Sequence, residues 1–155
     1  MTYATQLARI AAIVSAVGDI GRVHSWPRFG DAAEHYVTTV DGIRQIRGWE
    51  IGLDDTGIEG QRVTEAHAAH YTNWRIRGYL SLADEAASYN TIIALAEQIR
   101  AGLEADPTLA GACLDMVGEN QGSPDISPPD NFTIGGGHLC WTITIGFTTY
   151  DIGSI

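Results

Sequence analysis

The sequence predicts an α+β fold in which a mainly antiparallel sheet is covered on one face by a long helix, with a short helix at the N-terminus. The first supporting observation is a stretch over about 88–106 whose apolar residues recur at helical spacing. The stripe comprises Ile92, Leu95, Ala96, Ile99 and Leu103. The second is a set of segments before and after this stretch that alternate apolar with polar residues, as strands do. A stripe this apolar must be buried, and these strands are available to cover it.

The ends of the 88–106 helix carry residues with known terminal preferences. Ser88 is the expected N-cap, because a serine hydroxyl accepts a hydrogen bond from a free first-turn amide. Ser81 with Asp84 is a second candidate start, since the pair is spaced like a capping box. Pro107 is expected to stop the helix, because proline disfavours helical geometry at the residue before it and has no amide proton.

Before this helix, the chain is predicted to alternate short helices with strands. The expected elements are, in order, a helix over 3–16, a strand over 21–26, a helix over 32–40, and strands over 43–53 and 70–80. The β-branched run Val37–Val40 would also suit a strand. A polar loop over about 54–66 is expected to join the two longer strands.

After the helix, further strands are expected over 109–117 and 139–147. The second has one apolar face and one threonine-rich face, which favours an antiparallel sheet with helices on one side and water or a partner on the other. The polar connection over 118–137 is long for a structureless loop, and such loops are usually functional or disordered. The tail from Tyr150 is expected to be short and loose.

The composition indicates one folded domain over residues 1–155. Its apolar fraction is 45% and its charged fraction 18%. The formal net charge of −10 argues against nonspecific binding to duplex DNA, which needs cations facing the phosphates. No signal peptide and no apolar run of about 20 residues is visible, so we expect synthesis in the cytoplasm and no membrane partner.

Catalytic and metal-ligating patterns are sparse, so we expect no enzyme activity, no cofactor and no metal. His67 and His70 lie three apart beside Glu65 and would share a face of a helix, whereas a strand places them on opposite faces. A small metal-dependent enzyme that uses this His67/His70 region is the rival interpretation. Cys113 and Cys140 are too few and too far apart for a metal knuckle or a disulfide framework, so free, reduced thiols are expected.

The strand over 70–80 offers the best candidate for a contact surface. Alternation places Arg75, Arg77 and Tyr79 on one face, opposite the apolar face that carries Trp74 and Ile76. Tyrosine and arginine are enriched at protein interfaces, and all nine basic residues of this chain are arginines, whose planar fork suits carboxylate pairing. We therefore predict oligomer or partner contacts at Arg75, Arg77 and Tyr79.

The order of the motifs along the chain points to a family. The motifs are an N-terminal helix, Val23-His24 before Trp26, Gly48-Trp49-Glu50-Ile51, Trp74-Arg-Ile-Arg-Gly-Tyr79, a helix from Ser88 to Asp106-Pro-Thr-Leu109, and a closing apolar strand. This layout resembles the tail terminators of long-tailed bacteriophages and of phage-derived gene transfer particles. Head–tail connectors and tail-completion proteins share the size and the helix-plus-sheet layout, and they stay open as alternatives.

The resemblance implies a structural virion protein of the tail or neck. Tail terminators form a ring, usually a hexamer, that caps the tail tube and offers a docking face for the filled head. The implied partners are further copies of the chain, the tail tube protein and the head–tail connector or neck protein, while DNA passes through the ring without specific binding. The 54–66 and 118–137 loops would then be assembly elements. A contractile or secretion machine descended from a tail would share this physics and is a third interpretation.

Overall fold

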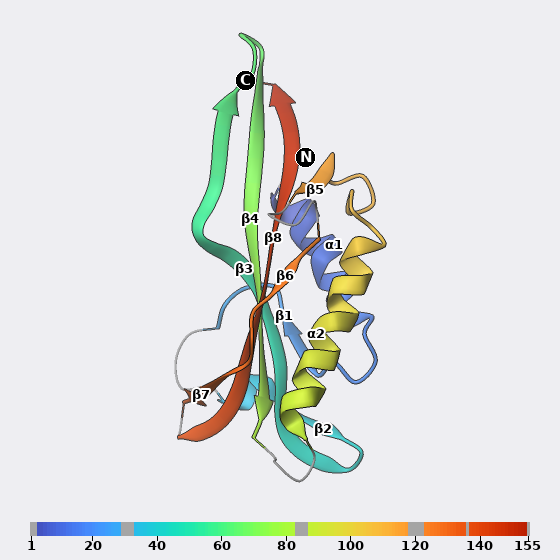
Figure 1. Ribbon diagram of the computed structural model, residues 1–155, viewed down its shortest axis with the longest axis vertical. Helices are drawn as coiled ribbons and strands as arrows, with labels where there is room; N and C mark the ends of the chain where they lie inside the picture. The colour runs from blue at the N-terminus through green and yellow to red at the C-terminus, as the bar shows by residue number, and fades with distance from the viewer. Residues whose placement is uncertain (1–2, 29–32, 83–86, 118–122, 136, 155) are drawn as a thin grey trace.

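The computed structural model describes residues 3–28, 33–82, 87–117, 123–135 and 137–154, which form two α-helices, one 3₁₀ helix and eight strands (Figure 1). The elements are α1 (Tyr3–Ser15), β1 (Arg22–His24), η1 (Ala33–Tyr36), β2 (Val37–Val40), β3 (Ile43–Arg62), β4 (His67–Ser81), α2 (Ser88–Glu104), β5 (Asp115–Val117), β6 (Asp125–Ile126), β7 (Asp130–Ile134) and β8 (His138–Ser154).

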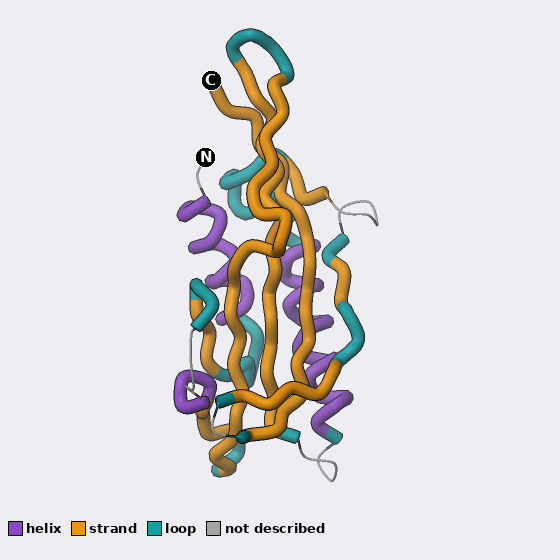
Figure 2. Tube along the Cα trace, turned by 90° about the vertical axis from the view of Figure 1, so that its left-hand side faces the viewer, coloured by secondary structure: helices purple, strands orange, loops and turns teal. Residues whose placement is uncertain are grey.

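The strands form one mostly antiparallel sheet, which confirms the prediction of helices combined with such a sheet. Its centre is β3, β4 and β8, each antiparallel to the next. The edge strand β1 joins β3 in parallel, β2 pairs with the start of β3, and β5, β6 and β7 pair with successive parts of β8. Both α-helices lie on the same face of this sheet (Figures 1 and 2).

The main hydrophobic core lies between the sheet and the two helices. It contains the stripe predicted on α2 together with two fully buried tryptophans of the sheet, Trp49 and Trp74. The indole nitrogen of Trp49 donates to the carbonyl of Ile20 at 3.0 Å, and that of Trp74 donates to the hydroxyl of Thr149 at 2.9 Å. Each buried indole therefore keeps a hydrogen-bond partner, which removes the desolvation cost of its polar atom.

A second, smaller core lies on the opposite face, at the end of the sheet where η1, β2 and β7 fold back over it. Its buried residues are Ala33, Tyr36, Ile46, Tyr79, Ile134 and Cys140. Part of the face expected to meet water or a partner is therefore covered by the chain itself.

The hairpin of β3 and β4 continues past the helices and, with the end of β8, forms a three-stranded extension at the top of Figure 1. We call residues 54–72 and 150–154 the arm. Its strands stay in register to the end, because Gln61 lies opposite Ala69, and Ala69 lies opposite Ile152.

A wide bulge in β3 marks the base of the arm. Leu53 lies opposite Trp74, but the next pair is Ile58 with Thr72, so four residues of β3 face the single residue Asn73 of β4. Such bulges bend the strand that carries the extra residues, and β3 changes direction at this height in Figure 1.

Side chains fix the shape of this bulge. One carboxylate oxygen of Asp54 accepts hydrogen bonds from the amides of Thr56 and Gly57 and from the Thr56 hydroxyl. The amide group of Asn73 donates to the Gly57 carbonyl at 3.1 Å and accepts from the Thr148 hydroxyl at 2.7 Å. Asn73 thus ties the bulge to β8.

The predicted polar loop over 54–66 is wrong, because β3 runs to Arg62 and β4 starts at His67. Only four residues turn the chain. The amides of Val63 and Thr64 donate to the His67 carbonyl, and the Thr64 hydroxyl accepts from the His67 amide. Polar residues form strands here because they pair across the hairpin, which composition alone does not reveal.

The prediction of a long helix over 88–106 is also wrong, since α2 has 17 residues and ends at Glu104. Ser88 is not its N-cap. Ala87 holds that position with a left-handed φ of 50° and no side-chain cap, while the Ser88 hydroxyl accepts from the Trp141 indole at 3.2 Å. The half-buried indole needs an acceptor, and Ser88 supplies it.

The C-terminal end of α2 is set by the segment after it. Asp106 precedes a proline, which disfavours helical geometry there, and its carboxylate accepts from Arg9 at 2.7 Å and from the Ala110 amide at 2.9 Å. The alternative helix start is not supported at Ser81, which belongs to β4, and Asp84 lies outside the described residues.

Two further predicted elements differ. The 32–40 segment is not one helix, because η1 ends at Tyr36 and the β-branched run pairs with β3 as β2. The 109–117 segment is a strand only from Asp115, because Leu109 and Ala110 have positive φ values of 49° and 56°, which strand geometry excludes.

The C-terminal predictions also need correction. The tail from Tyr150 is not loose, since β8 continues to Ser154 by pairing with β4. The connection over 118–137 is not structureless in its described part, where β6 and β7 pair with β8. Residues 118–122 and 136 of this connection lie outside the described residues.

Candidate interaction surface

We call the sheet face that α1 and α2 leave uncovered the outer face; it is turned toward the viewer in Figure 2. Strand alternation and the β3–β4–β8 register place Arg75, Arg77 and Tyr79 on this face, as predicted, since the neighbouring Trp74 and Ile76 belong to the main core. The threonine-rich side of β8 lies beside them. The three predicted contact residues therefore share a face but differ in exposure.

Arg75 has one open side. Its neighbours across the sheet are Gly52 on β3 and Gly146 on β8. Pro27 packs over Gly52, where an added Cβ would lie 3.0 Å from the proline ring, whereas a Cβ added at Gly146 would meet no atom within 4 Å. Arg75 pairs with Asp55 at 3.8 Å, but the Asp55 side chain is fully exposed. Ion pairs this long and this exposed are weak in water, so Arg75 can exchange this partner.

Arg77 lies two residues further along β4, on the same face. No ion pair between described residues involves it. It lines a groove of about 260 Å³. The other lining residues are Pro128, Asp130, Phe132, Thr142 and Thr144. The groove joins a guanidinium to the exposed ring of Phe132, a combination typical of protein contact surfaces.

Tyr79 is buried, with 5% of its surface exposed, so the prediction that it is displayed as a contact residue is not supported in the isolated chain. Its ring packs 5.0 Å from that of Tyr36 and 5.5 Å from that of Phe132. Its hydroxyl donates to Glu50 at 3.0 Å. The second core covers this position, which local alternation cannot reveal.

Glu50 is the centre of a buried polar cluster on this face. One of its carboxylate oxygens accepts from the Tyr36 hydroxyl at 2.5 Å and from the Arg28 amide at 3.2 Å, and the other accepts from Tyr79. Three donors thus satisfy a carboxylate that would be costly to bury alone. Gly48 makes room for this arrangement, because a Cβ there would lie 2.5 Å from the Tyr36 ring.

The cluster keeps both phenols protonated. Burial raises the pKa of Tyr79 to about 12, with a further contribution from the charge of Glu50 that Arg77 partly offsets. Burial and the hydrogen bond to Glu50 raise the pKa of Tyr36 further. Both tyrosines therefore act as hydrogen-bond donors to Glu50 near neutral pH, so the cluster is a structural support beneath the outer face.

The rim of this cluster is aromatic and basic. The Arg28 guanidinium lies 5.2 Å over the exposed ring of Trp26 and 3.2 Å from the His35 ring. His24 hydrogen-bonds the His35 carbonyl at 2.7 Å. The sequence predictions missed Glu50, although they named its partner Tyr79. The available signal was an acidic residue in a strand whose neighbours on the same side, Gly48 and Gly52, are both glycines.

The rival metal-dependent interpretation required His67 and His70 to converge. Both lie in β4, three residues apart, where strand geometry directs them to opposite faces. The His70 ring lies beside Gly60 and Gly153, where an added Cβ would be 3.5–3.6 Å from it. The His67 ring contacts the Thr64 hydroxyl at 3.3 Å. Within the described residues, no group of three or more His, Cys, Asp or Glu side chains could hold a metal ion.

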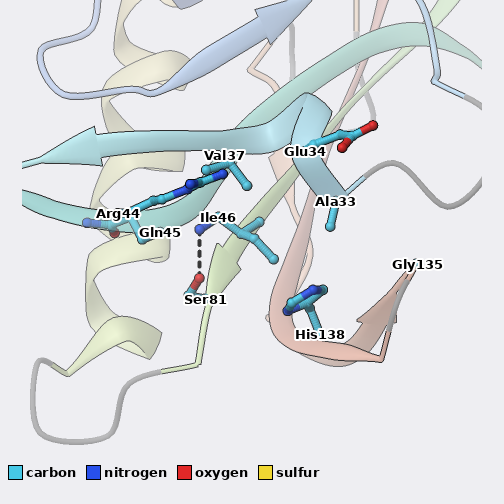
Figure 3. Close-up of a pocket in the computed structure, with 9 residues that line it drawn as sticks. All are labelled: Ala33, Glu34, Val37, Arg44, Gln45, Ile46, Ser81, Gly135 and His138. Atoms are coloured by element: carbon cyan, nitrogen blue, oxygen red, sulfur yellow. Dashed lines mark hydrogen bonds between the residues drawn. The ribbon is translucent and has the colours of Figure 1, made fainter.

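A hollow of about 520 Å³ lies at the end of the sheet opposite the arm, between η1, β2 and the β7–β8 turn (Figure 3). Its rim carries Glu34, Arg44 and His138, which reach it from separate elements. The Ser81 hydroxyl accepts from the Ile46 amide at 2.7 Å, so it is engaged in holding two strands together. This open hollow therefore presents mixed charges around an apolar floor.

Across the described residues, no helix is long and apolar enough to cross a membrane. A scan of the chain against protein-family models finds no match, and a search of curated proteins finds no similar sequence.

Proposed function

We propose that this protein is a structural assembly protein that forms a ring, caps a tail tube and joins a tail to a head. The motif order that resembles tail terminators suggests this role, and the arm is the observation that supports it best. None of the arm's described residues belongs to either hydrophobic core, and a ribbon that is not packed on a core has little stability of its own in water. Such an arm gains stability by packing on another molecule, which is what assembly requires.

The edges of the arm favour the same proposal. Among the described residues, no further strand pairs with the outer edge of β3 over 58–62 or with β8 over 151–154. Exposed strand edges present unpaired amides and carbonyls to other chains. Two exposed apolar side chains of the arm, Ile58 and Val63, are 50% and 55% exposed. A neighbouring subunit would cover both kinds of group.

The arm and the exposed part of the outer face are different surfaces on one chain. A contact between them is head-to-tail, and head-to-tail contacts between identical subunits form rings when the rotation closes. A head–tail connector or a tail-completion protein would use the same contacts at a neighbouring position, so these are alternative sites of action for one assembly mechanism.

The experiment that tests the proposal is absolute mass in solution across concentration, followed by addition of purified tail tube protein. We expect a species of roughly six times 16.7 kDa, alone or on the tube, and tubes whose growth stops once it binds. Electron microscopy of the capped tubes would show the ring at one end. A chain that stays monomeric at every concentration and leaves tube growth unchanged would refute the proposal.

A further inference from the structure

We propose that the acidic arm of one copy docks on the outer face of the next copy, where its carboxylates pair with Arg75 and Arg77. This inference rests on the ring proposed above and names the two surfaces that close it. The occupant of the outer face is thus a second copy of this chain rather than a different protein.

Charge complementarity is the first argument. The arm carries five carboxylates and one arginine, a formal net charge of −4 with histidine neutral. They are Asp54, Asp55, Glu59, Glu65, Asp151 and Arg62. Asp151 is buried and Asp54 holds the bulge, so the carboxylates exposed for docking are those of Asp55, Glu59 and Glu65. The exposed part of the outer face offers Arg75, whose pair in its own chain is long and solvent-exposed, and Arg77, which has no ion pair among the described residues. Guanidinium groups bind carboxylates through two parallel hydrogen bonds, which gives such a contact geometric specificity.

Distance along the strands argues that the contact is between copies. Glu59 lies opposite Tyr71, and its carboxylate accepts from the Asn73 side-chain amide at 3.5 Å, so its contact within its own chain is with Asn73. Glu65 lies in the turn at the tip, ten residues from Arg75 and therefore about 33 Å away. An extended, paired strand cannot fold back over such a distance. The Glu65 carboxylate therefore reaches an Arg75 or Arg77 only when the arginine belongs to another subunit.

Exposed apolar side chains complete the match. Phe132 is 42% exposed and borders the groove that Arg77 lines, and the arm carries Ile58 and Val63, both at least half exposed. Burial of these side chains in one contact would supply the apolar centre that stable interfaces have, with the ion pairs at its rim.

Charge reversal tests the contact. The arm variant is Glu59→Arg with Glu65→Arg, and the face variant is Arg75→Glu with Arg77→Glu. Each alone places like charges opposite each other and should weaken association roughly a hundredfold. Mixed in equal amounts, the two variants present opposite charges at both contacts and should recover assembly into rings in which they alternate. A matched control, Glu34→Arg with Glu97→Arg, reverses two exposed charges elsewhere and should assemble as the wild type does.

Sedimentation velocity reads out each sample, and near-ultraviolet circular dichroism verifies that each variant is folded. If both variants assemble as the wild type does, the arm-to-face contact is refuted while the ring proposal stands. If each variant is monomeric and their mixture stays monomeric, the contact is refuted as well, because complementary charges did not restore it. A wild-type chain that never assembles, alone or on tubes, refutes the ring and the contact together.

Discussion

Replacing Asn73 with alanine should loosen the arm and leave the helix-covered sheet intact. The Asn73 side chain is 8% exposed and makes two short hydrogen bonds, to the Gly57 carbonyl at 3.1 Å and from the Thr148 hydroxyl at 2.7 Å. A buried hydrogen bond of this kind contributes about 1 kcal/mol net. Gly57 and Thr148 are half-buried, so water can satisfy them after the substitution. The expected loss is therefore about 2 kcal/mol, confined to the bulge.

Amide hydrogen exchange measures this loss residue by residue. A local destabilisation of about 2 kcal/mol raises the population of the open arm roughly thirtyfold. Amides over 58–62 and 67–72 should therefore exchange roughly thirtyfold faster, while those of Ile51 and Ile76 in the main core keep their wild-type rates. Asn90→Ala is the matched control, because Asn90 is an exposed residue of α2 and its loss should change neither region.

Two results would refute this reasoning. Equal acceleration of arm and core amides would mean that Asn73 stabilises the whole sheet rather than the bulge. Unchanged exchange in the arm would mean that the two hydrogen bonds of the Asn73 side chain stabilise the arm no more than hydrogen bonds to water would. In either case the arm could not be treated as a separately adjustable element of the fold.

Three further outcomes are expected. Gly78→Ala would place a Cβ within 2.5–2.7 Å of the buried Trp49 ring. In denaturant titrations it should lower the free energy of unfolding by about 1–3 kcal/mol. Gly146→Ala is the control, because its Cβ would meet no atom within 4 Å and should change the free energy of unfolding little. Burial and the charge of Glu50 raise the pKa of Tyr79 to about 12, above the value near 10 of an unfolded tyrosine. The contribution of Tyr79 to the free energy of unfolding is therefore complete below pH 10 and should be lost between about pH 10 and 12. Tyr79→Phe should flatten the dependence of the free energy of unfolding on pH in this range. Burial raises the pKa of both cysteine thiols to about 11, so a disulfide reagent at pH 8 should label the native protein far more slowly than the chain in denaturant.

The elements that could be predicted from sequence are those with one buried and one exposed face. The alternation in β8 over 139–147 and in β4 over 74–80 is strong because the main core lies against one side only. The α2 stripe is visible for the same reason, with helical rather than strand periodicity. In each case a local pattern records a burial that spans the whole element.

The arm could not be predicted because neither of its faces is buried against a core. Residues 58–62 read Ile-Glu-Gly-Gln-Arg, which shows no alternation and contains a glycine. These residues form a strand because β4 pairs with them across the hairpin, which is a contact between segments rather than a property of one segment. A polar composition therefore predicted a loop where the chain forms its longest hairpin.

Tyr79 shows how one strand face can hold two environments. Alternation correctly placed it beside Arg75 and Arg77, yet η1 and β7 fold over its end of the outer face and bury it against Tyr36. This cover ends near Arg77, where Phe132 of β7 borders the groove, and Arg75 beyond it is open on the side of Gly146. The second core thus limits the exposed outer face to the stretch nearest the arm. Because the arm is acidic and this stretch carries two arginines, subunits that meet through them would bring opposite charges together.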